Sequence, residues 1–437
     1  MTRVSHGIDR VAVSFDDPTL VANAGLLLVS TLVVRLGLEA LINSTMCLGG
    51  LVGGALPGRK VLTLVHSIVA GGTHIDHADI LRSGASDAVL GHRVMAPSTL
   101  GTFLRACTFG HVRQLEDVMG VALARAWAAG AGPGADLLVV DVDSTICQVA
   151  GKSKQGAAYG YTKVLGFHPI LASRADTGEI LHARMRKGSA NTARGGRRFI
   201  AELIARVRRA GATGAITLRF DSGFWSNDTI ALLGRLNVRY TMAVRTSVKA
   251  VARAIATIDE TGWTTIDYPD GGEAQVAECV YGDRRLVVRR TRLTGAAQAE
   301  MWPNWRHFAF LTDLGGDAVS VDAFHRRHAV VELTIREVKE GSGLEHIPSG
   351  NFSANSVWMC CAVLAHNLIR WTMILGEPRR ADQLIVARTV RVQFIAIAAR
   401  LVNRAGRLTL RGPTDWPWGA DFIAILDILR AIEPAPG

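Results

Sequence analysis

A glycine-rich stretch, residues 130–134 with the sequence Gly-Ala-Gly-Pro-Gly, separates two parts of the chain that differ in hydrophobic pattern. Before it, apolar residues recur at the spacing of amphipathic helices, whereas after it a run of β-branched residues begins at Leu137. Strand-like and helix-like segments then follow one another. The sequence therefore predicts an α/β fold that is preceded by an all-helical region over residues 1–130.

Short helices are predicted throughout this first region. Asp17 followed by Pro18 is typical of a helix start, because aspartate caps free N–H groups and proline fits the first helical position. The predicted helices run from Pro18 to about Met46, from Arg59 to Ala70, around Ile75–Leu81, from Pro97, and from His111 to Ala129. Short capped helices with basic residues are compatible with a DNA-binding helix-turn-helix. A helical bundle that only packs is the alternative.

The composition indicates a polyanionic partner, of which nucleic acid is the usual one, although a ribosome-adjacent or membrane-surface role would also fit the charge alone. The formal net charge is +11 at pH 7 and the sequence pI is near 9.8, and basic side chains that neutralise phosphates release counterions. Two apolar stretches, Leu26–Val34 and Val357–Leu368, are shorter than the ~20 residues of a membrane span. The N-terminus also lacks the plan of a secretion signal. We therefore expect a cytoplasmic protein with no membrane partner.

Two predicted strands in the second part of the chain end in an acid. The strand Leu137–Asp143 ends at Asp143, and the strand Ile216–Phe220 runs into Asp221. Capping of the following turn is the common alternative for one such acid, but two in one α/β pattern point to a site. Metal-dependent cleavage of a phosphodiester uses two divalent ions, which proteins hold with a few carboxylates. Asp143 and Asp221 are therefore candidate metal ligands.

Asp141 competes with Asp143 for this role, because residues two apart in a strand face the same side. Asp143 lies at the open end of the strand and precedes Ser144 and Thr145, where solvent and substrate have access. We therefore favour Asp143.

A third acid is expected on a helix that packs on the sheet. In the predicted helix Val321–Lys339, Glu332 and Lys339 are separated by two helical turns and so share one face. A carboxylate and a cation on one face could bind a metal ion and then a phosphate. Glu337 falls on another face and is expected to be solvated. An ordinary charged surface is the alternative interpretation of this helix.

The changes of pattern divide the chain into five parts. They are a helical DNA-binding region (1–130), the first part of a catalytic core (136–248), a β-rich insertion (249–316), the second part of the core with the Glu332 helix (317–376), and a C-terminal region for DNA contact or dimerisation (377–437).

These motifs together resemble the DDE transposases of bacterial insertion sequences. Asp143-Ser144-Thr145 follows a strand, Asp221 comes after a long gap, and Glu332 comes after a still longer gap and is followed by Lys339. The resemblance is to the cut-and-paste branch, whose RNase H-like core carries a β-strand insertion before the glutamate helix. The second gap leaves room for such an insertion. The resemblance extends over most of the chain, including residues 151–169 and 341–355.

The resemblance implies an RNase H-like core in which Asp143, Asp221 and Glu332 hold two Mg²⁺ or Mn²⁺ ions. It also implies nicking by water and joining by a 3′-hydroxyl, with terminal inverted repeats and target DNA as double-stranded partners. A homodimer would pair two ends in the bacterial cytoplasm, associated with the nucleoid. A metal-dependent nuclease of the same fold and an inactive DNA-binding copy are the alternatives.

The same resemblance adds candidate DNA contacts. The branch commonly carries Tyr-x2-Arg-x3-Glu-x6-Lys, and here histidines occupy the tyrosine and arginine positions. Histidine can donate to a phosphate, although it is only partly charged at neutral pH. A glycine-rich segment after Asp143 holds nearly half of the lysines. The candidate DNA-binding residues are Lys152, Lys154, Lys163, His325, His328, Arg336 and Lys339.

Trp302 and Trp305 near the end of the insertion are candidates for stacking on a flipped base, which members of the branch use, although core aromatics are the commoner interpretation. The pattern His74-x-Asp76-His77-x-Asp79 resembles metal-ligand spacing, but acids near a helix N-terminus account for it better.

Overall fold

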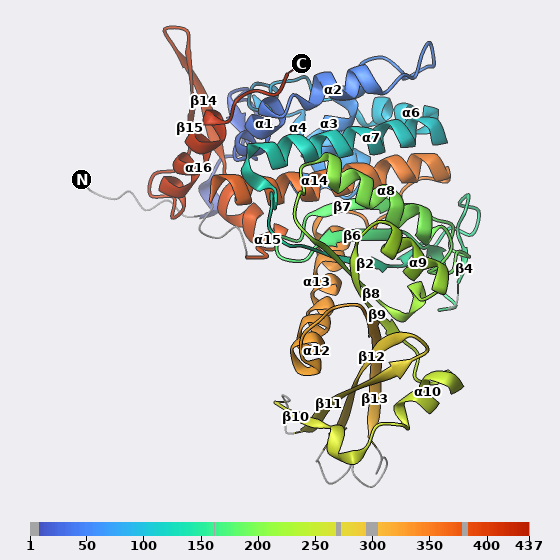
Figure 1. The fold of residues 1–437 in the computed structure, drawn as a ribbon. Coiled ribbons are helices and arrows are strands. Elements are labelled where there is room, and N and C mark those ends of the chain that lie inside the picture. The colour runs from blue at the N-terminus through green and yellow to red at the C-terminus, as the bar shows by residue number, and fades with distance from the viewer. Residues whose placement is uncertain (1–7, 161, 268–271, 294–304, 378–382, 437) are drawn as a thin grey trace.

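The computed structural model describes residues 8–160, 162–267, 272–293, 305–377 and 383–436. Trp302 lies outside these residues. Figure 1 shows three regions: a helical layer that contains the N-terminal third of the chain, a central sheet, and a lobe formed by the far end of that sheet.

Within the described residues a nine-stranded sheet has the order β10-β11-β12-β13-β9-β8-β2-β6-β7. The strands β2, β8 and β9 are parallel neighbours, and the other pairs are antiparallel. The strands are β2 (Leu138–Ser144), β6 (Ile170–Arg174), β7 (Ile180–Arg184), β8 (Ile216–Phe220), β9 (Arg239–Val244), β10 (Thr264–Ile266), β11 (Gly272–Tyr281), β12 (Arg284–Leu293) and β13 (Arg306–Thr312).

The predicted β-rich insertion is part of this same sheet. Its last strand, β13, pairs with β9 of the central region, with Thr312 opposite Thr241 and Ala309 opposite Val244. The lobe at the bottom of Figure 1 is therefore an extension of the central sheet.

The helices of the N-terminal region, residues 1–130, lie on one side of the sheet. They are α1 (Leu26–Arg35), α2 (Leu38–Thr45), α3 (Pro57–Val69), α4 (Ala78–Leu81), α5 (Ser86–Leu90), α6 (Pro97–Ala106) and α7 (Phe109–Ala126). The prediction of one helix from Pro18 to Met46 was wrong. The chain forms the short strand β1 (Leu20–Val21), begins α1 only at Leu26, and bends by 58° between α1 and α2. Gly37 allows this bend because its φ of +59° is left-handed.

The remaining helices belong to the second part of the chain. They are α8 (Gly196–Arg209), α9 (Asn227–Arg235), α10 (Lys249–Ile255), α12 (Ala318–Arg326), α13 (Val330–Arg336), α14 (Phe352–Gly376), α15 (Ala387–Val390) and α16 (Gly419–Ala431). Two small sheets complete the fold, one of β1 with the hairpin β14 (Ala399–Arg404) and β15 (Arg407–Arg411), the other of β3 (Cys147–Gln148), β4 (Ala158–Tyr159) and β5 (Leu165–Phe167).

Helix α14 is the centre of the helical layer and packs against α3, α6, α7 and α16. It is longer than the apolar stretch predicted from the sequence, and its 25 residues are enough to cross a membrane by length and composition. The apolar window that meets this criterion is entirely buried inside the protein. Asn367 fixes α14 to β7, because its side chain accepts from the Ile180 N–H and donates to the Ile180 carbonyl, both at 2.8 Å. These contacts are typical of a core helix.

One hydrophobic core runs from the N-terminal helices through α14 to the central sheet. A second, small cluster of Val276, Val287, Phe310 and Val321 joins α12 to the insertion strands. The N-terminal helices therefore share their core with the sheet, and their predicted role in DNA binding stays a prediction.

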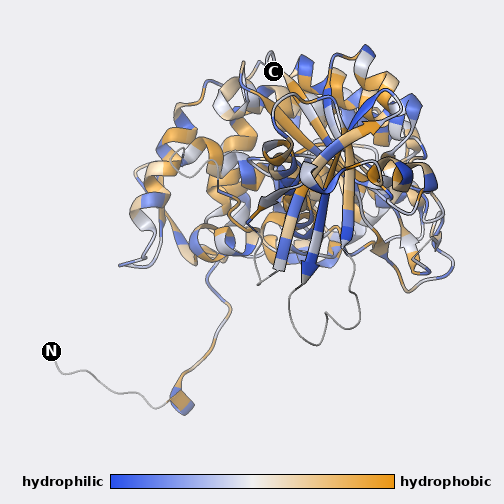
Figure 2. Cartoon of the chain, turned by 60° about the horizontal axis from the view of Figure 1, so that its bottom comes forward, coloured by the Kyte–Doolittle hydropathy of each residue, from blue (hydrophilic) through white to orange (hydrophobic). Residues whose placement is uncertain are grey.

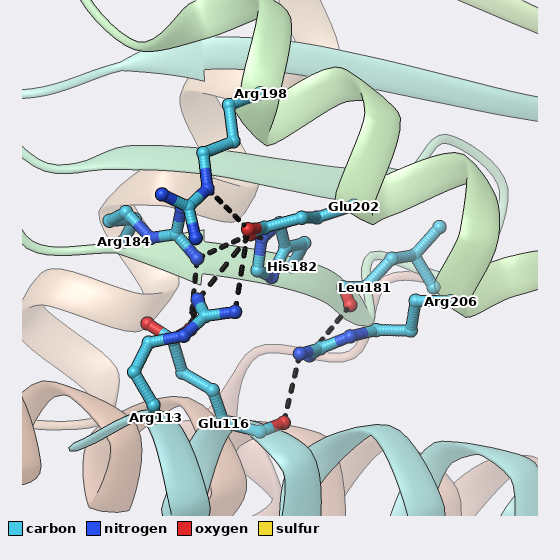
Figure 3. A network of polar contacts seen from close by, with 8 residues as sticks. All are labelled: Arg113, Glu116, Leu181, His182, Arg184, Arg198, Glu202 and Arg206. Carbon is cyan, nitrogen blue, oxygen red and sulfur yellow. Dashed lines mark hydrogen bonds and ion pairs between the residues drawn. The ribbon is translucent and has the colours of Figure 1, made fainter. Parts of the chain in front are cut away.

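A seam of charged side chains also joins the helical layer to the sheet (Figure 3). Glu202 of α8 accepts hydrogen bonds from Arg184 of β7, from Arg198 at 2.9 Å and from Arg113 of α7 at 3.3 Å. His182 adds a further hydrogen bond to Glu202, at 3.3 Å. These bonds hold the pKa of the Glu202 carboxyl well below its usual range, and the bond from His182 makes the largest contribution.

Candidate active site

Asp143 and Asp221 lie side by side at the carboxyl ends of two neighbouring strands. In the parallel pairing of β2 with β8, Val142 is opposite Phe220, so the next residue on each strand is one of these acids. Asp143 accepts a hydrogen bond from the Ser144 N–H at 2.6 Å, and Asp221 accepts one from the Gly223 N–H at 3.0 Å. The fold thus brings together two of the predicted acids that are far apart in the sequence.

The electrostatics of this pair reflect crowding of negative charge. Burial, together with the nearby carboxylates of Asp221 and Glu332, raises the pKa of Asp143 to about 6, while the Ser144 N–H and His328 act in the opposite direction. Burial also raises the pKa of Asp221. Like charges held together away from water are costly unless a cation neutralises them. The arrangement therefore suits a positively charged ligand.

Asp141 has a different environment from Asp143. Its side chain is 1% exposed and accepts two hydrogen bonds from Arg219, from Nε and Nη2, each at 2.7 Å. His328 donates a third from Nδ1 at 2.6 Å. Three hydrogen bonds occupy the Asp141 carboxylate, so its role is structural. The choice of Asp143 as the acid that faces substrate stays a prediction.

Three residues that lie opposite one another on neighbouring strands hold the segment before Glu332. Asp141 on β2 is opposite Arg219 on β8, which is opposite Thr241 on β9. Asp141 binds His328, Arg219 donates to the Phe324 carbonyl at 2.8 Å, and Thr241 hydrogen bonds with His325 at 2.7 Å. Because all three residues hold the segment 324–328, they fix the position at which α13 begins. Sequence reasoning missed Arg219 and Thr241.

His325 and His328, for which phosphate contacts were predicted, form hydrogen bonds within the protein. His325 stacks on Phe310 at 4.1 Å between ring centroids, and burial lowers its pKa to about 3, so the ring is neutral. His328 uses Nδ1 on Asp141. Both histidines are turned toward the sheet, and we interpret them as positioning residues for Glu332.

Glu332 and Lys339 face one cavity with Asp143. The cavity, of about 250 Å³, is lined by Asp143, Ser144, Thr145, Glu332, Ile335, Arg336, Lys339 and Glu340. The predicted sharing of one face by Glu332 and Lys339 is therefore present, although α13 ends at Arg336 and a π-helical turn continues to Gly341. The Lys339 ammonium lies 3.9 Å from Glu345.

Glu337 differs from the expectation that it would be solvated. Its Oε2 accepts a hydrogen bond from the Ala387 N–H at 2.7 Å, at the start of α15. This carboxylate therefore satisfies a free N–H group of a helix N-terminus.

The three lysines after Asp143 have unequal environments. Lys152 and Lys163 are exposed, whereas Lys154 is half-buried and donates to the Ile347 carbonyl. The neighbouring Gln155 N–H donates to the Gly350 carbonyl at 2.8 Å. Lys154 thus joins its loop to the segment that follows the Glu332 helix, and Lys152 and Lys163 remain available for a phosphate.

Known proteins resemble this chain in sequence and in fold. A family model described as Transposase DDE domain group 1 matches residues 5–434. The chain belongs to this transposase family. A solved structure described as a "piggyBac transposase synaptic complex with hairpin DNA" is similar in fold, with a TM-score of 0.50 and 12% identity over 86% of this chain and 79% of that chain. No curated protein matches the chain.

Members of this DDE transposase family generally use divalent metal ions. In the described part of the chain, no three His, Cys, Asp or Glu side chains lie close enough to hold one ion as they stand. In a two-ion site one or two protein ligands per ion are enough, because water and phosphate complete the coordination sphere of each ion. Hard carboxylate oxygens from Asp143, Asp221 and Glu332 fit such ions, since the pKa of Asp143 is raised by burial and by the two neighbouring carboxylates.

Proposed function

We propose that the chain is the transposase of a bacterial insertion sequence, which binds terminal inverted repeats, nicks DNA and joins the freed ends to target DNA. The observation that carries this proposal is the placement of Asp143 beside Asp221, with Glu332 facing the same cavity, in a chain of the DDE transposase family. We further propose that β2, β6, β7, β8, β9 and α13 form an RNase H-like core.

Five residues of the candidate site have a proposed role. Asp143, Asp221 and Glu332 would hold two Mg²⁺ or Mn²⁺ ions, which activate the attacking oxygen and stabilise the leaving one. Lys339 and Arg336 line the same cavity and would bind the phosphate beside the cut.

The DNA partner is supported by charge and by relatedness. The net charge of +11 suits a polyanion, and the structurally similar transposase was solved with hairpin DNA. We propose that a homodimer pairs two ends and that the N-terminal helices and exposed Lys152 and Lys163 contact the duplex. A nuclease without strand transfer and an inactive DNA-binding copy are the outcomes that would replace this function.

The test uses a labelled duplex with the element's terminal repeat, incubated with Mg²⁺ or with EDTA. We expect metal-dependent nicks at the element boundary that are lost in Asp221→Asn and Glu332→Ala, with binding retained. Glu340→Gln, in the same cavity, is the matched control and should nick normally. Normal nicking by Asp221→Asn would refute the site. Binding without nicking by the wild-type chain would indicate an inactive copy, and nicking without joining would indicate a nuclease.

A further inference from the structure

The N-terminal arm, residues 8–16, carries apolar side chains in water. All nine residues are exposed, and Ile8, Val11, Val13 and Phe15 are 92%, 62%, 76% and 101% exposed. Figure 2 shows this segment leaving the body of the molecule. Removing such apolar surface from water is favourable in proportion to the area buried. The arm is therefore a candidate for docking on another surface.

The pattern of the arm suits an added β-strand. Val11, Val13 and Phe15 are spaced by two, so in an extended chain they point to the same side. Fully extended, an arm of this length spans about 30 Å. The arm continues directly into Thr19, whose carbonyl accepts from the Leu401 N–H at 2.8 Å, and into β1, which pairs with β14. Its starting point is thus fixed on the small C-terminal sheet.

A groove for such a strand lies beside the same sheet. The C-terminal groove, a cavity of about 510 Å³, is bounded by α1, α5, the β14–β15 hairpin and α16. Most of its lining is apolar, and Leu408 and Ile423 on its rim are 59% and 60% exposed. In the described part of the chain β15 pairs only with β14, so its outer edge is open. An open edge accepts a further strand through main-chain hydrogen bonds.

Charge favours the arm over DNA as the occupant of this groove. The arm carries Asp9 and Asp16 with only Arg10 in opposition, whereas Arg407 and Arg430 line the groove. Opposite charges on two surfaces favour their association and set its orientation. An acidic arm is unsuited to binding a phosphate backbone.

The arm leaves the small C-terminal sheet at the edge opposite to the open edge of β15. Strands β1 and β15 flank β14 on opposite sides, and the arm leaves from β1. Exchange with a second copy places each arm in the other's groove, and this closes a two-fold dimer. We propose that residues 8–16 of one chain dock in the C-terminal groove of a second copy and add a strand to the outer edge of β15. The proposal does not depend on the proposed DNA chemistry.

Disulfide trapping tests which chain fills the groove. In a Cys47→Ser background, which removes an exposed thiol, one tagged chain carries Ser14→Cys and a differently tagged chain carries Thr409→Cys. Mixing and oxidation should give a disulfide between the two chains. The control pair replaces Thr409→Cys with Val52→Cys, at an exposed site outside the groove, and should not cross-link. A Ser14→Cys/Thr409→Cys double variant that closes only within one chain would overturn the proposal.

Sedimentation measured over a range of protein concentrations tests how strongly two copies of the chain associate. The wild-type chain should reach twice the 46.9 kDa of one copy, and Phe15→Asp or Ile423→Asp should raise the dissociation constant at least tenfold. Phe15 is entirely exposed, so its replacement does not disturb the fold. Val52→Asp is the control, since Val52 is 82% exposed elsewhere. A wild-type monomer at every concentration, or dimers unaffected by both variants, would refute the proposal. The nicking assay with Glu332→Ala reads the proposed function separately.

Discussion

Asp141 and Arg219 face each other across the parallel strands β2 and β8 and form a two-pronged ion pair that is almost fully buried. Both members also hold the segment before Glu332, through His328 and the Phe324 carbonyl. The pair is therefore part of the sheet and part of the support of the candidate active site.

Removing Arg219 should destabilise the fold strongly. Arg219→Met leaves the Asp141 carboxylate buried with His328 as its remaining side-chain hydrogen-bond partner, and loss of one member of a buried pair costs ~3–5 kcal/mol. Urea unfolding at pH 7 measures the effect. Arg197→Met breaks an exposed pair with Asp228 and should cost less than about 1 kcal/mol. Equal effects of the two variants would refute the role of the buried pair.

Asp143→Asn should stabilise the chain when no metal is present. The substitution removes one of three crowded carboxylates whose proximity raises the pKa of Asp143. We expect the free energy of unfolding at pH 8 in EDTA to rise by ~1–3 kcal/mol. Mg²⁺ should stabilise the wild-type chain more than the variant, because the ion relieves the same repulsion. Thermal unfolding with and without Mg²⁺ measures both effects, and a variant less stable than wild type in EDTA would contradict them.

His328→Ala should impair cleavage while DNA binding persists. The substitution removes the 2.6 Å hydrogen bond to Asp141 and with it part of the support of Glu332. Loss of such an orienting contact at a metal site typically costs roughly 10–100-fold in activity. His328→Asn can still donate a hydrogen bond and should recover part of the rate. Gel-shift and nicking assays on one duplex separate the two properties, and equal loss of binding would point to a direct DNA contact.

Glu202 should make folding stability depend on pH. Its depressed pKa in the folded chain means that its contribution is fully present above the ordinary glutamate value of about 4.3 and is lost as pH falls toward the folded value. Glu202→Gln should therefore cost about 1 kcal/mol at pH 7, after allowance for partial exposure. The difference from wild type should shrink below pH 4 in chemical unfolding. Glu278→Gln, in an exposed pair with Arg285, is the control at each pH, and a Glu202→Gln deficit that did not change with pH would contradict this prediction.

The local pattern of the sequence predicted the two acid-ending strands and the face shared by Glu332 and Lys339, because these depend on spacing along one element. It could not predict that Arg219 pairs with Asp141, since that contact depends on the register of two strands that are distant in sequence. An arginine inside the apolar strand Ile216–Phe220 was the signal that a buried partner existed.

The N-terminal region shows a second limit of local reasoning. Asp17-Pro18 is a favourable helix start, yet the chain there pairs as β1 with β14, which lies near the other end of the sequence. The long-range strand pairing overrode the local preference. The hydrophobic core that the N-terminal helices share with α14 was likewise not visible from sequence, because this contact arises only in three dimensions.

The pairing of β13 with β9 has a consequence for how much of the chain can be dispensed with. Without residues 249–316, the strand β9 would be left with a bare row of N–H and C=O groups, a template on which other chains can aggregate. With them, the sheet terminates instead in the much shorter strand β10. The insertion thus covers the edge of β9, and a chain without residues 249–316 would need another element on this edge to avoid aggregation.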